Sequence, residues 1–383
     1  MASRPVSDPI RQRYTRFVAA TLKQRIPTIL KTAEAGFDAA TVERLKGISR
    51  VIEADGAMVI DLRGWPFKGW EQLPARMNGK RPSQTPFFDF EYWMYFRILS
   101  AVRFGETRTD PFRSVKHRDL EKHIAWADEA LTKITDLKGG LNLSLDANAH
   151  DLSQVSKPGK TYDIGRELLD IDAANLTRLN IIADNFGGEF VADLVLAIIA
   201  AEAGVEVVVH VKQLPIFVSD TTADDVTILL DRVSSSGVFG KRLLEAVRRG
   251  LIRFASNPFW SAPEFLDRLP VEELGTGERV LTVLKGDLNF RRAIGDVTVD
   301  VETPFERLLL LPSAPLLSLR SIKSYCVAGV TAWPQGVSKT DFPMDGSIVA
   351  VQRIPTRATA SVGSSSDTAP LLPRVRRWLR RKA

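Results

Sequence analysis

Hydrophobic residues follow two different periods along this 383-residue chain. In the first 140 residues they recur every three or four positions, which is the period of an amphipathic helix. The pattern predicts helices over residues 10–30, 40–54, 87–104 and 119–137. We expect the first helix to break at Pro27 and the last to stop at Gly139 and Gly140. The aromatic stretch 87–104 could stack a ligand, but such a stripe is more typical of a buried core.

From about residue 168, short apolar runs alternate with helical patterns. These runs predict strands at residues 179–183, 205–211, 252–255, 280–284 and 316–319, with helices between them, notably over 189–203 and 222–233. The alternation predicts an α/β fold, a three-layer α/β/α arrangement with a mostly parallel sheet, preceded by a helical N-terminal region. We expect three parts: helical residues 1–140, an α/β domain at 141–355, and a disordered linker with a basic tail at 356–383.

The formal net charge of +6 lies in the last residues of the chain. The final stretch, "LLPRVRRWLRRKA", holds six Arg or Lys residues and no acid, so the rest of the chain is neutral overall. Such a tail is either simply solvated or contacts an anionic surface, and specific nucleic-acid binding as the main function is not expected. One cysteine, Cys326, excludes an internal disulfide and favours a reducing compartment, and no apolar run is long enough for a membrane span. We therefore expect a cytoplasmic protein.

Polar residues collect where the predicted strands end. Asp184 and Asn185 follow the first strand, and Asp220 follows the second. Lys285 ends the fourth strand and is followed by Asp287 and Arg291, whereas Arg320 and Lys323 follow the fifth. Because ligands of an open parallel sheet bind beyond the carboxyl ends of its strands, we expect these side chains to share one site.

These residue types indicate a particular chemistry. Carboxylate and amide oxygens suit Mg²⁺ or Mn²⁺, whereas the four histidines are scattered and form no zinc motif. Arg and Lys side chains suit an anionic substrate, and metal, cations and a carboxylate together are typical of phosphoryl transfer. The alternative for each acid is a helix cap, and Asp220 before two threonines could be only that.

Five stretches, "ADNFGGEF", "FVSDTT", "NPFW", "LKGDLNFR" and "LRSIK", occur in this order. Over roughly residues 141–330 the chain thereby resembles the metal-dependent damage-control phosphatases, a family once known only as a domain of unknown function. The branch it resembles includes an acidic-residue methyltransferase and sugar-phosphate phosphatases. The order of the five stretches carries the resemblance, because none of them is specific alone.

The resemblance implies a divalent metal ion, which would be Mn²⁺, Co²⁺, Ni²⁺ or Mg²⁺, on Asp184, Asn185 and Asp220. It implies a small phosphorylated metabolite as substrate, such as fructose 1-phosphate or fructose 6-phosphate. Further substrate contacts are expected from Glu189, Asp287, Leu288, Asn289, Phe290, Arg291, Arg320 and Lys323. Asp184 and Asp287 are the candidates to orient or deprotonate the attacking water, and direct attack by an Asp carboxylate is an alternative.

The sequence also departs from that branch. Its usual D-N-A-G-F-E is D-N-F-G-G-E here, which places Phe186 at the metal turn. Ser321 stands for a Thr, and Phe290 replaces a common Tyr. The rival functions are an S-adenosylmethionine-dependent carboxyl methyltransferase, for which Glu189 is linked to the methyl donor, and a sugar-phosphate-binding protein without activity. A haloacid-dehalogenase motif and a P-loop are both poorly matched.

Overall fold

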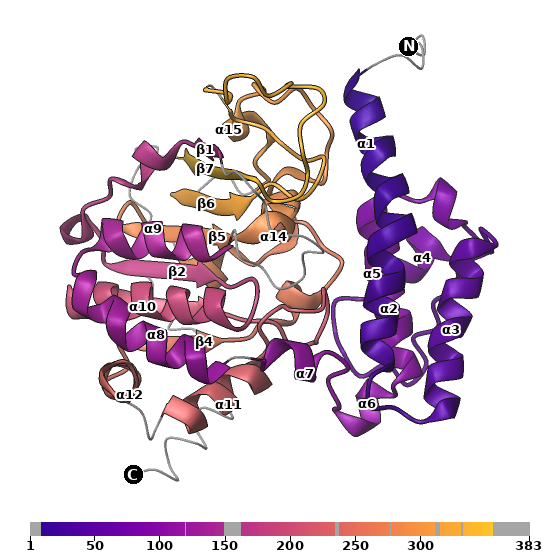
Figure 1. Cartoon of the computed structure of the whole chain (residues 1–383), viewed down its shortest axis with the longest axis horizontal. Coiled ribbons are helices and arrows are strands. Elements are labelled where there is room, and N and C mark those ends of the chain that lie inside the picture. Colours follow the sequence, from indigo (N-terminus) through magenta and orange to yellow (C-terminus); the bar gives the residue numbers. More distant parts are fainter. Residues whose placement is uncertain are drawn as a thin grey trace.

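The computed structural model describes residues 9–118, 120–148, 162–233, 237–275, 277–310, 315–330 and 332–354. The linker and basic tail predicted at 356–383 lie outside these residues. Figure 1 shows a mixed sheet flanked by helices, with the first helices standing beside one edge of the sheet.

The predicted mostly parallel sheet is confirmed. It has the order β1-β7-β6-β5-β2-β3-β4, and only β6 and β7 run antiparallel to each other. The strands are β1 (Tyr162–Ile164), β2 (Arg178–Ile182), β3 (Glu206–His210), β4 (Ile252–Ala255), β5 (Val280–Lys285), β6 (Leu316–Ser321) and β7 (Ile348–Ile354). The five predicted strands are β2 to β6. Strands β1 and β7 were not anticipated, since β1 has only three residues and β7 lies beyond the region of clear alternation.

Helices lie on both sides of the sheet. Helices α8 (Leu120–Lys133), α9 (Leu137–Asn148), α10 (Gly188–Glu202) and α12 (Val238–Arg248) share one large hydrophobic core with the strands. Helix α11 (Ala223–Val233) contributes to the same core, and the remaining α-helices described in this half are α13 (Val271–Leu274), α14 (Gly286–Ile294) and α15 (Phe305–Leu308). Helix α14 packs against β5 and β6 and belongs to a second core.

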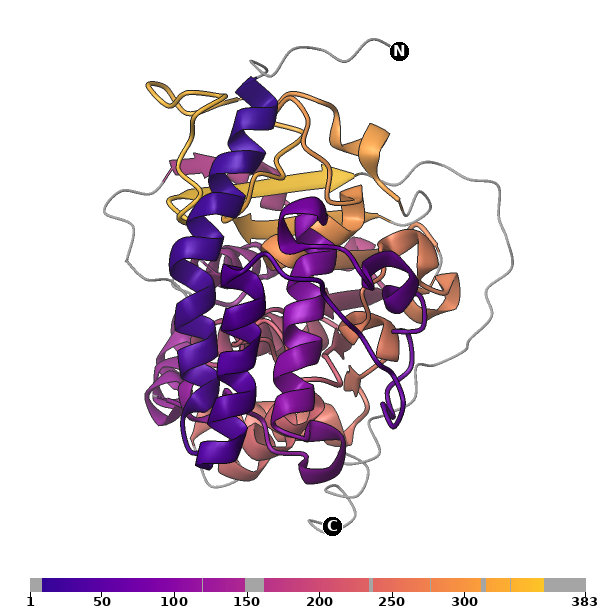
Figure 2. The same ribbon diagram turned by 90° about the vertical axis from the view of Figure 1, so that its right-hand side faces the viewer.

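The N-terminal helices supply most of that second core. They are α1 (Pro9–Ala20), α2 (Ile26–Glu34), α3 (Ala39–Glu53), α4 (Leu73–Met77), α5 (Phe87–Ala101), α6 (Phe104–Thr107) and α7 (Arg113–Lys116). The aromatic helix α5 is buried along nearly its whole length, as expected of a core stripe. The same core includes Ile182 and Leu284, near the carboxyl ends of β2 and β5, so these helices cover that edge of the sheet. Figure 2 shows α1, α2 and α5 standing in front of it.

The predicted break at Pro27 does not occur. Helix α1 continues through a π-helical turn, Thr21–Arg25, directly into α2. A proline lacks the N–H of the helical ladder, and its ring crowds the carbonyl four residues earlier. Pro27 lies just after the start of α2, where the wider preceding turn leaves room for the ring.

Gly139 and Gly140 were wrongly predicted to stop a helix. Helix α8 ends earlier, at Lys133, and both glycines lie inside α9. A Cβ atom on Gly140 would lie 3.0 Å from Cδ1 and 3.2 Å from Cα of Leu196 in α10. The glycine therefore serves the close packing of two helices and not the end of one.

Among the described residues, no helix is both long and apolar enough to cross a membrane.

The packing at Gly140 gives a matched pair of substitutions. Gly47, in α3, would meet only the tip of Arg50 at 3.7 Å, so Gly47→Ala should stabilise the protein by about 0.5–1 kcal/mol. Gly140→Ala gains the same helix propensity but presses on the backbone of α10, and should lower the free energy of unfolding, by about 1 kcal/mol. Urea denaturation of both variants checks this, and equal stabilisation by both would contradict the packing argument.

Candidate active site

A cavity of about 50 Å³ lies between the carboxyl edge of the sheet and the N-terminal helices. Its walls combine loops of the α/β half with side chains of α1, the π-helical turn and α5. The lining residues are Phe17, Arg25, Glu91, Asp184, Asn185, Phe217, Asp220, Asp287, Leu288, Arg291, Lys323 and Ser324.

Seven of the residues predicted from the sequence meet at this cavity, namely Asp184, Asn185, Asp220, Asp287, Leu288, Arg291 and Lys323. The other four, Glu189, Asn289, Phe290 and Arg320, are not among the described side chains that line it. They are buried just behind the wall. The functional roles of all eleven stay predictions.

Glu189 holds Asn185 from behind. One carboxylate oxygen of Glu189 accepts from Nδ2 of Asn185 at 2.8 Å, and the other accepts from Nδ2 of Asn148 at 2.7 Å. The side-chain oxygen of Asn185 accepts from the hydroxyl of Ser219. Because Glu189 can only accept hydrogen bonds when ionised, it fixes which end of the Asn185 amide is the oxygen.

Lys285 forms ion pairs that hold Glu189 in place. It ends β5, is fully buried, and lies 3.0 Å from Asp193 and 3.4 Å from Glu189. It also donates to the hydroxyl of Ser144 at 2.8 Å. Burial raises the pKa of Asp193 to about 6, against the attraction of Lys285. The turn after β2 thus rests on a buried ionic network joining α9, α10 and β5.

Gly286 allows α14 to begin beside Asp184. Its φ is +76°, and a Cβ atom there would lie 1.8 Å from Oδ2 of Asp184. No side chain fits in that space. The glycine of the "LKGDLN" stretch is therefore required both by its backbone conformation and by the neighbouring carboxylate.

The segment before Asp220 has a strained backbone. Phe217 and Val218 have φ values of +59° and +67°, which are unusual for a bulky or β-branched residue. The Phe217 ring packs against Tyr92 and Tyr95 of α5, with centroids 5.3 and 4.8 Å apart. The N-terminal helices thereby hold in place the segment that delivers Asp220.

Asp220 does not cap the following helix. Thr222 and Asp225 cap α11 reciprocally: Asp225 accepts from the backbone N–H and the hydroxyl of Thr222 at 2.8 and 2.7 Å, and Thr222 accepts from the N–H of Asp225 at 3.3 Å. Asp220 instead forms an ion pair with Lys212 at the cavity. The capping alternative for Asp220 is therefore wrong.

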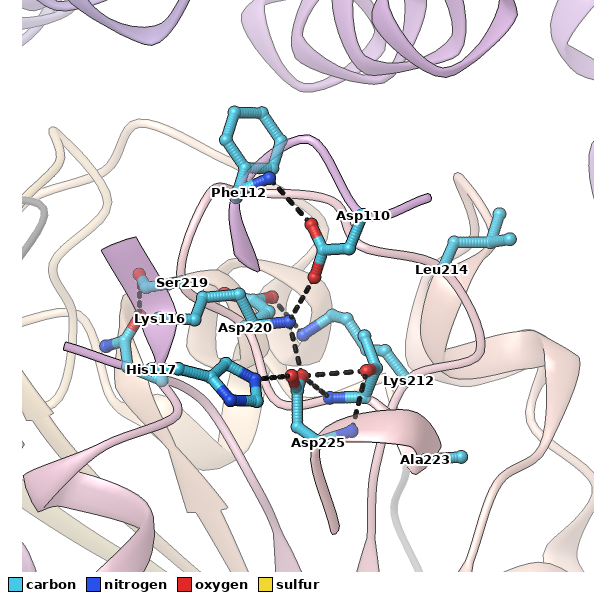
Figure 3. Close-up of polar contacts among 12 residues, drawn as sticks. Asp110, Phe112, Lys116, His117, Lys212, Leu214, Ser219, Asp220, Ala223 and Asp225 are labelled. Carbon is cyan, nitrogen blue, oxygen red and sulfur yellow. Dashed lines mark hydrogen bonds and ion pairs between the residues drawn. The ribbon is translucent and has the colours of Figure 1, made fainter. Parts of the chain in front are cut away.

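A second buried ionic network surrounds Asp225 and is drawn in Figure 3. Lys116 bridges Asp225 and Asp110, and Nε2 of His117 lies 2.8 Å from Asp225. The His117 ring also lies against the ring of Phe186, with centroids 4.9 Å apart. Burial acts to raise the pKa of Asp225, but Lys116, His117 and Thr222 outweigh it and lower the pKa to about 2. The segment around α7 thus supports both turns that carry the predicted metal ligands.

Carboxylates crowd the cavity. Burial, Asp220 and Glu189 together raise the pKa of Asp184 well above its usual range, against the attraction of Lys212 and Lys323. A cation placed among these oxygens would remove the repulsion.

Two of the predicted substrate cations are already engaged. Arg291 binds Glu91 and Asp296, each at 2.6 Å, and is buried. Arg320 is fully buried, forms an ion pair with Asp287, and lies over the Phe290 ring with its guanidinium carbon 3.5 Å from the centroid. Arg320 therefore orients Asp287 from behind the cavity wall.

The donor set fits a hard divalent cation. Two carboxylates and one amide, all oxygen donors, line the same cavity, and burial together with the neighbouring carboxylates raises the pKa of Asp184. In the part of the chain that the structure describes, no cluster of three or more His, Cys, Asp or Glu side chains could hold a metal ion. The predicted set contains only two such residues, so Asn185 is essential to it.

Comparison with known proteins identifies the family. The sequence model of the damage-control phosphatase ARMT1-like domain matches residues 21–337. The chain is 34% identical over 403 residues to damage-control phosphatase ARMT1 of Danio rerio, covering 82% of this chain and 89% of that protein. It is 32% identical over 173 residues to the protein of that name from Homo sapiens, covering 42% of this chain and only 39% of that protein.

The chain therefore belongs to the ARMT1-like damage-control phosphatase family. This confirms the resemblance seen in the sequence and agrees with the expected phosphatase class of enzyme. A crystal structure of a DUF89 family protein from Pyrococcus horikoshii aligns over 88% of this chain and 97% of its own, with 15% identity and a TM-score of 0.45.

The low pKa of Asp225 predicts a dependence of stability on pH. A carboxyl whose pKa is lower in the folded state, about 2 against an ordinary 3.8, stabilises the fold above the ordinary value and loses that effect as the pH falls toward 2. Asp225→Asn should therefore destabilise the protein at neutral pH, by about 2 kcal/mol or more. Its stability deficit relative to wild type should shrink between about pH 4 and pH 2.

Denaturant unfolding at pH 7, 5, 4 and 3 measures that deficit. Asp170→Asn is the matched control, because Asp170 is exposed and pairs only loosely with Lys138. A deficit that stays constant down to pH 3 would show that Asp225 does not act through its charge.

Proposed function

We propose that this protein is a divalent-metal-dependent phosphatase that hydrolyses phosphate monoesters of small metabolites. Sugar phosphates such as fructose 1-phosphate or fructose 6-phosphate are the first candidates. The observation that carries the proposal is the shared cavity of Asp184, Asn185, Asp220 and Asp287 with cationic side chains around it. Family membership supports the same class of reaction.

Asp184, Asn185 and Asp220 would hold the metal ion, for which Mn²⁺, Co²⁺, Ni²⁺ and Mg²⁺ are the candidates. When bound, such an ion supplies a Lewis acid that polarises phosphate oxygens. The chain itself contributes two helix N-termini, those of α10 and α14, which begin next to Asn185 and Asp287. Their partial positive charge favours an anionic group in the cavity.

In this proposal Asp287 would orient the attacking water. Oδ1 of Asp287 accepts from Arg320, and among the described residues no hydrogen bond engages Oδ2. The contact with Arg320 fixes the orientation of this carboxylate, which a group that accepts a proton in the reaction requires. Lys323, also at the cavity, would offset negative charge as the phosphate ester bond breaks.

Two rival functions can be separated from this proposal. A methyltransferase would transfer a methyl group from S-adenosylmethionine without needing a metal. Both oxygens of Glu189 are hydrogen-bonded to Asn148 and Asn185, which supports a role for this residue in holding the turn. A non-catalytic member of the family would bind a sugar phosphate and release nothing. We also propose a cytoplasmic location, which the single buried thiol of Cys326 supports.

The decisive experiment measures phosphate release from a panel of sugar phosphates, with EDTA or with each of the four metals. Wild-type protein should release phosphate only with metal. Asp184→Asn and Asp220→Asn should each lower the rate by about 10²-fold or more, because each removes a charged ligand from the site. Exposed Asp170→Asn serves as the control and should keep wild-type activity.

No release from folded wild-type protein with any metal would overturn the proposal. Methyl transfer from S-adenosylmethionine under the same conditions would favour the first rival, and phosphosugar binding without turnover would favour the second.

A further inference from the structure

The N-terminal helices contribute one cation to the cavity that the sequence analysis did not single out. Phe17 of α1 and Arg25 of the π-helical turn both line it, opposite the residues that follow the strands. Nothing in the local sequence around Arg25 resembles a binding motif. Its place at the site follows only from the packing of these helices over the sheet edge.

Arg25 differs from the other arginines near the site in its partners. Arg291 is bound by Glu91 and Asp296, and Arg320 is bound by Asp287. Among the described residues, by contrast, no hydrogen bond or ion pair is made by the side chain of Arg25. It is half-buried and lines the same cavity as three carboxylates that follow the strands, yet forms no salt bridge with them.

The carboxylates of the cavity are largely engaged elsewhere. Glu91 is bound to Arg291, Asp220 to Lys212, and Asp287 to Arg320. A half-buried guanidinium without an acceptor has lost part of its hydration and gained no ion pair in return. Such a group is typical of a binding site whose anion comes with the ligand.

The backbone at Arg25 supports this interpretation. Arg25 is the last residue of the π-helical turn, immediately before α2. Single π-helical turns occur often at functional sites because the wider turn redirects the side chains around it. Pro27 keeps the wide turn from relaxing to a regular helix, since a proline disfavours the ordinary i→i−4 pattern there.

We infer that Arg25 binds the phosphate group of the substrate from the side of the N-terminal helices. The guanidinium presents two parallel N–H donors to two phosphate oxygens, a geometry that lysine cannot reproduce. This inference rests on the proposed phosphatase function and extends it: the N-terminal helical region is then part of the substrate site. The phosphate group of the substrate must then lie between Arg25 and the predicted metal ligands.

The test measures binding of inorganic phosphate by calorimetry in the presence of Mg²⁺, together with KM and kcat for fructose 1-phosphate. Arg25→Gln keeps most of the side-chain stem and should weaken phosphate binding and raise KM by about 10- to 100-fold, the loss of a charge-assisted hydrogen-bond pair. Arg25→Lys, which keeps the charge but not the fork, should give an intermediate loss. Exposed Lys23→Ala lies in the same turn, and should leave both values unchanged.

Wild-type phosphate affinity in Arg25→Gln would overturn the inference, as would an equal loss in Lys23→Ala, which would point to damage to the turn. Thermal unfolding of each variant shows that the fold is kept. If the wild-type protein is active and Arg25→Gln has an unchanged KM, the role of Arg25 is refuted but the phosphatase function stands. If phosphate binding depends on Arg25 but no ester is hydrolysed, the phosphatase function is refuted and the anion-binding role of Arg25 stands.

Discussion

Two backbone hydrogen bonds hold together the segments that carry the predicted metal ligands. The N–H of Thr221 donates to the carbonyl of Asp184 at 2.8 Å, and the N–H of Phe186 donates to the carbonyl of Ser219 at 2.7 Å. They join the turn after β2 to the segment after β3, and bring the carboxylates of Asp184 and Asp220 to one cavity. The carboxylates of Asp184 and Asp220 repel each other when both are charged. The surrounding structure must therefore keep both segments in place.

Three supports do so, each from a different part of the chain. The buried network of Lys285, Glu189 and Asp193 lies under the first turn. The network around Asp225 connects α7 with the second segment, and the aromatic side chains of α5 pack on Phe217. Removing one partner from a buried ion pair leaves an unpaired charge and usually costs about 3–5 kcal/mol. The arrangement of the site therefore depends on the N-terminal helices as well as on the sheet.

The sequence predicted the α/β part well because its strands are short, apolar and separated by strong helical patterns. It predicted Asp184, Asn185 and Asp220 at one edge because residues that follow parallel strands must meet there. It failed at Pro27 and at the pair Gly139 and Gly140, where tertiary packing overrode the local preference for a break. It also missed β7, an apolar run whose pairing with β6 and β1 is fixed only by distant partners.

What the sequence determined by itself is therefore the class of fold, the family, and the meeting of Asp184, Asn185 and Asp220 at one cavity, since each depends on local pattern or on the order of short stretches. Which cations remain available to an anionic substrate was decided only by the tertiary structure. The sequence predicts Arg291 and Arg320 as substrate contacts, and only the structure shows that both also form ion pairs with carboxylates. In the sequence Arg25 has no feature that distinguishes it from other helix residues, yet in the structure it lines the cavity. The physical reason is that the availability of a charge depends on its neighbours in space, and a linear sequence does not specify them.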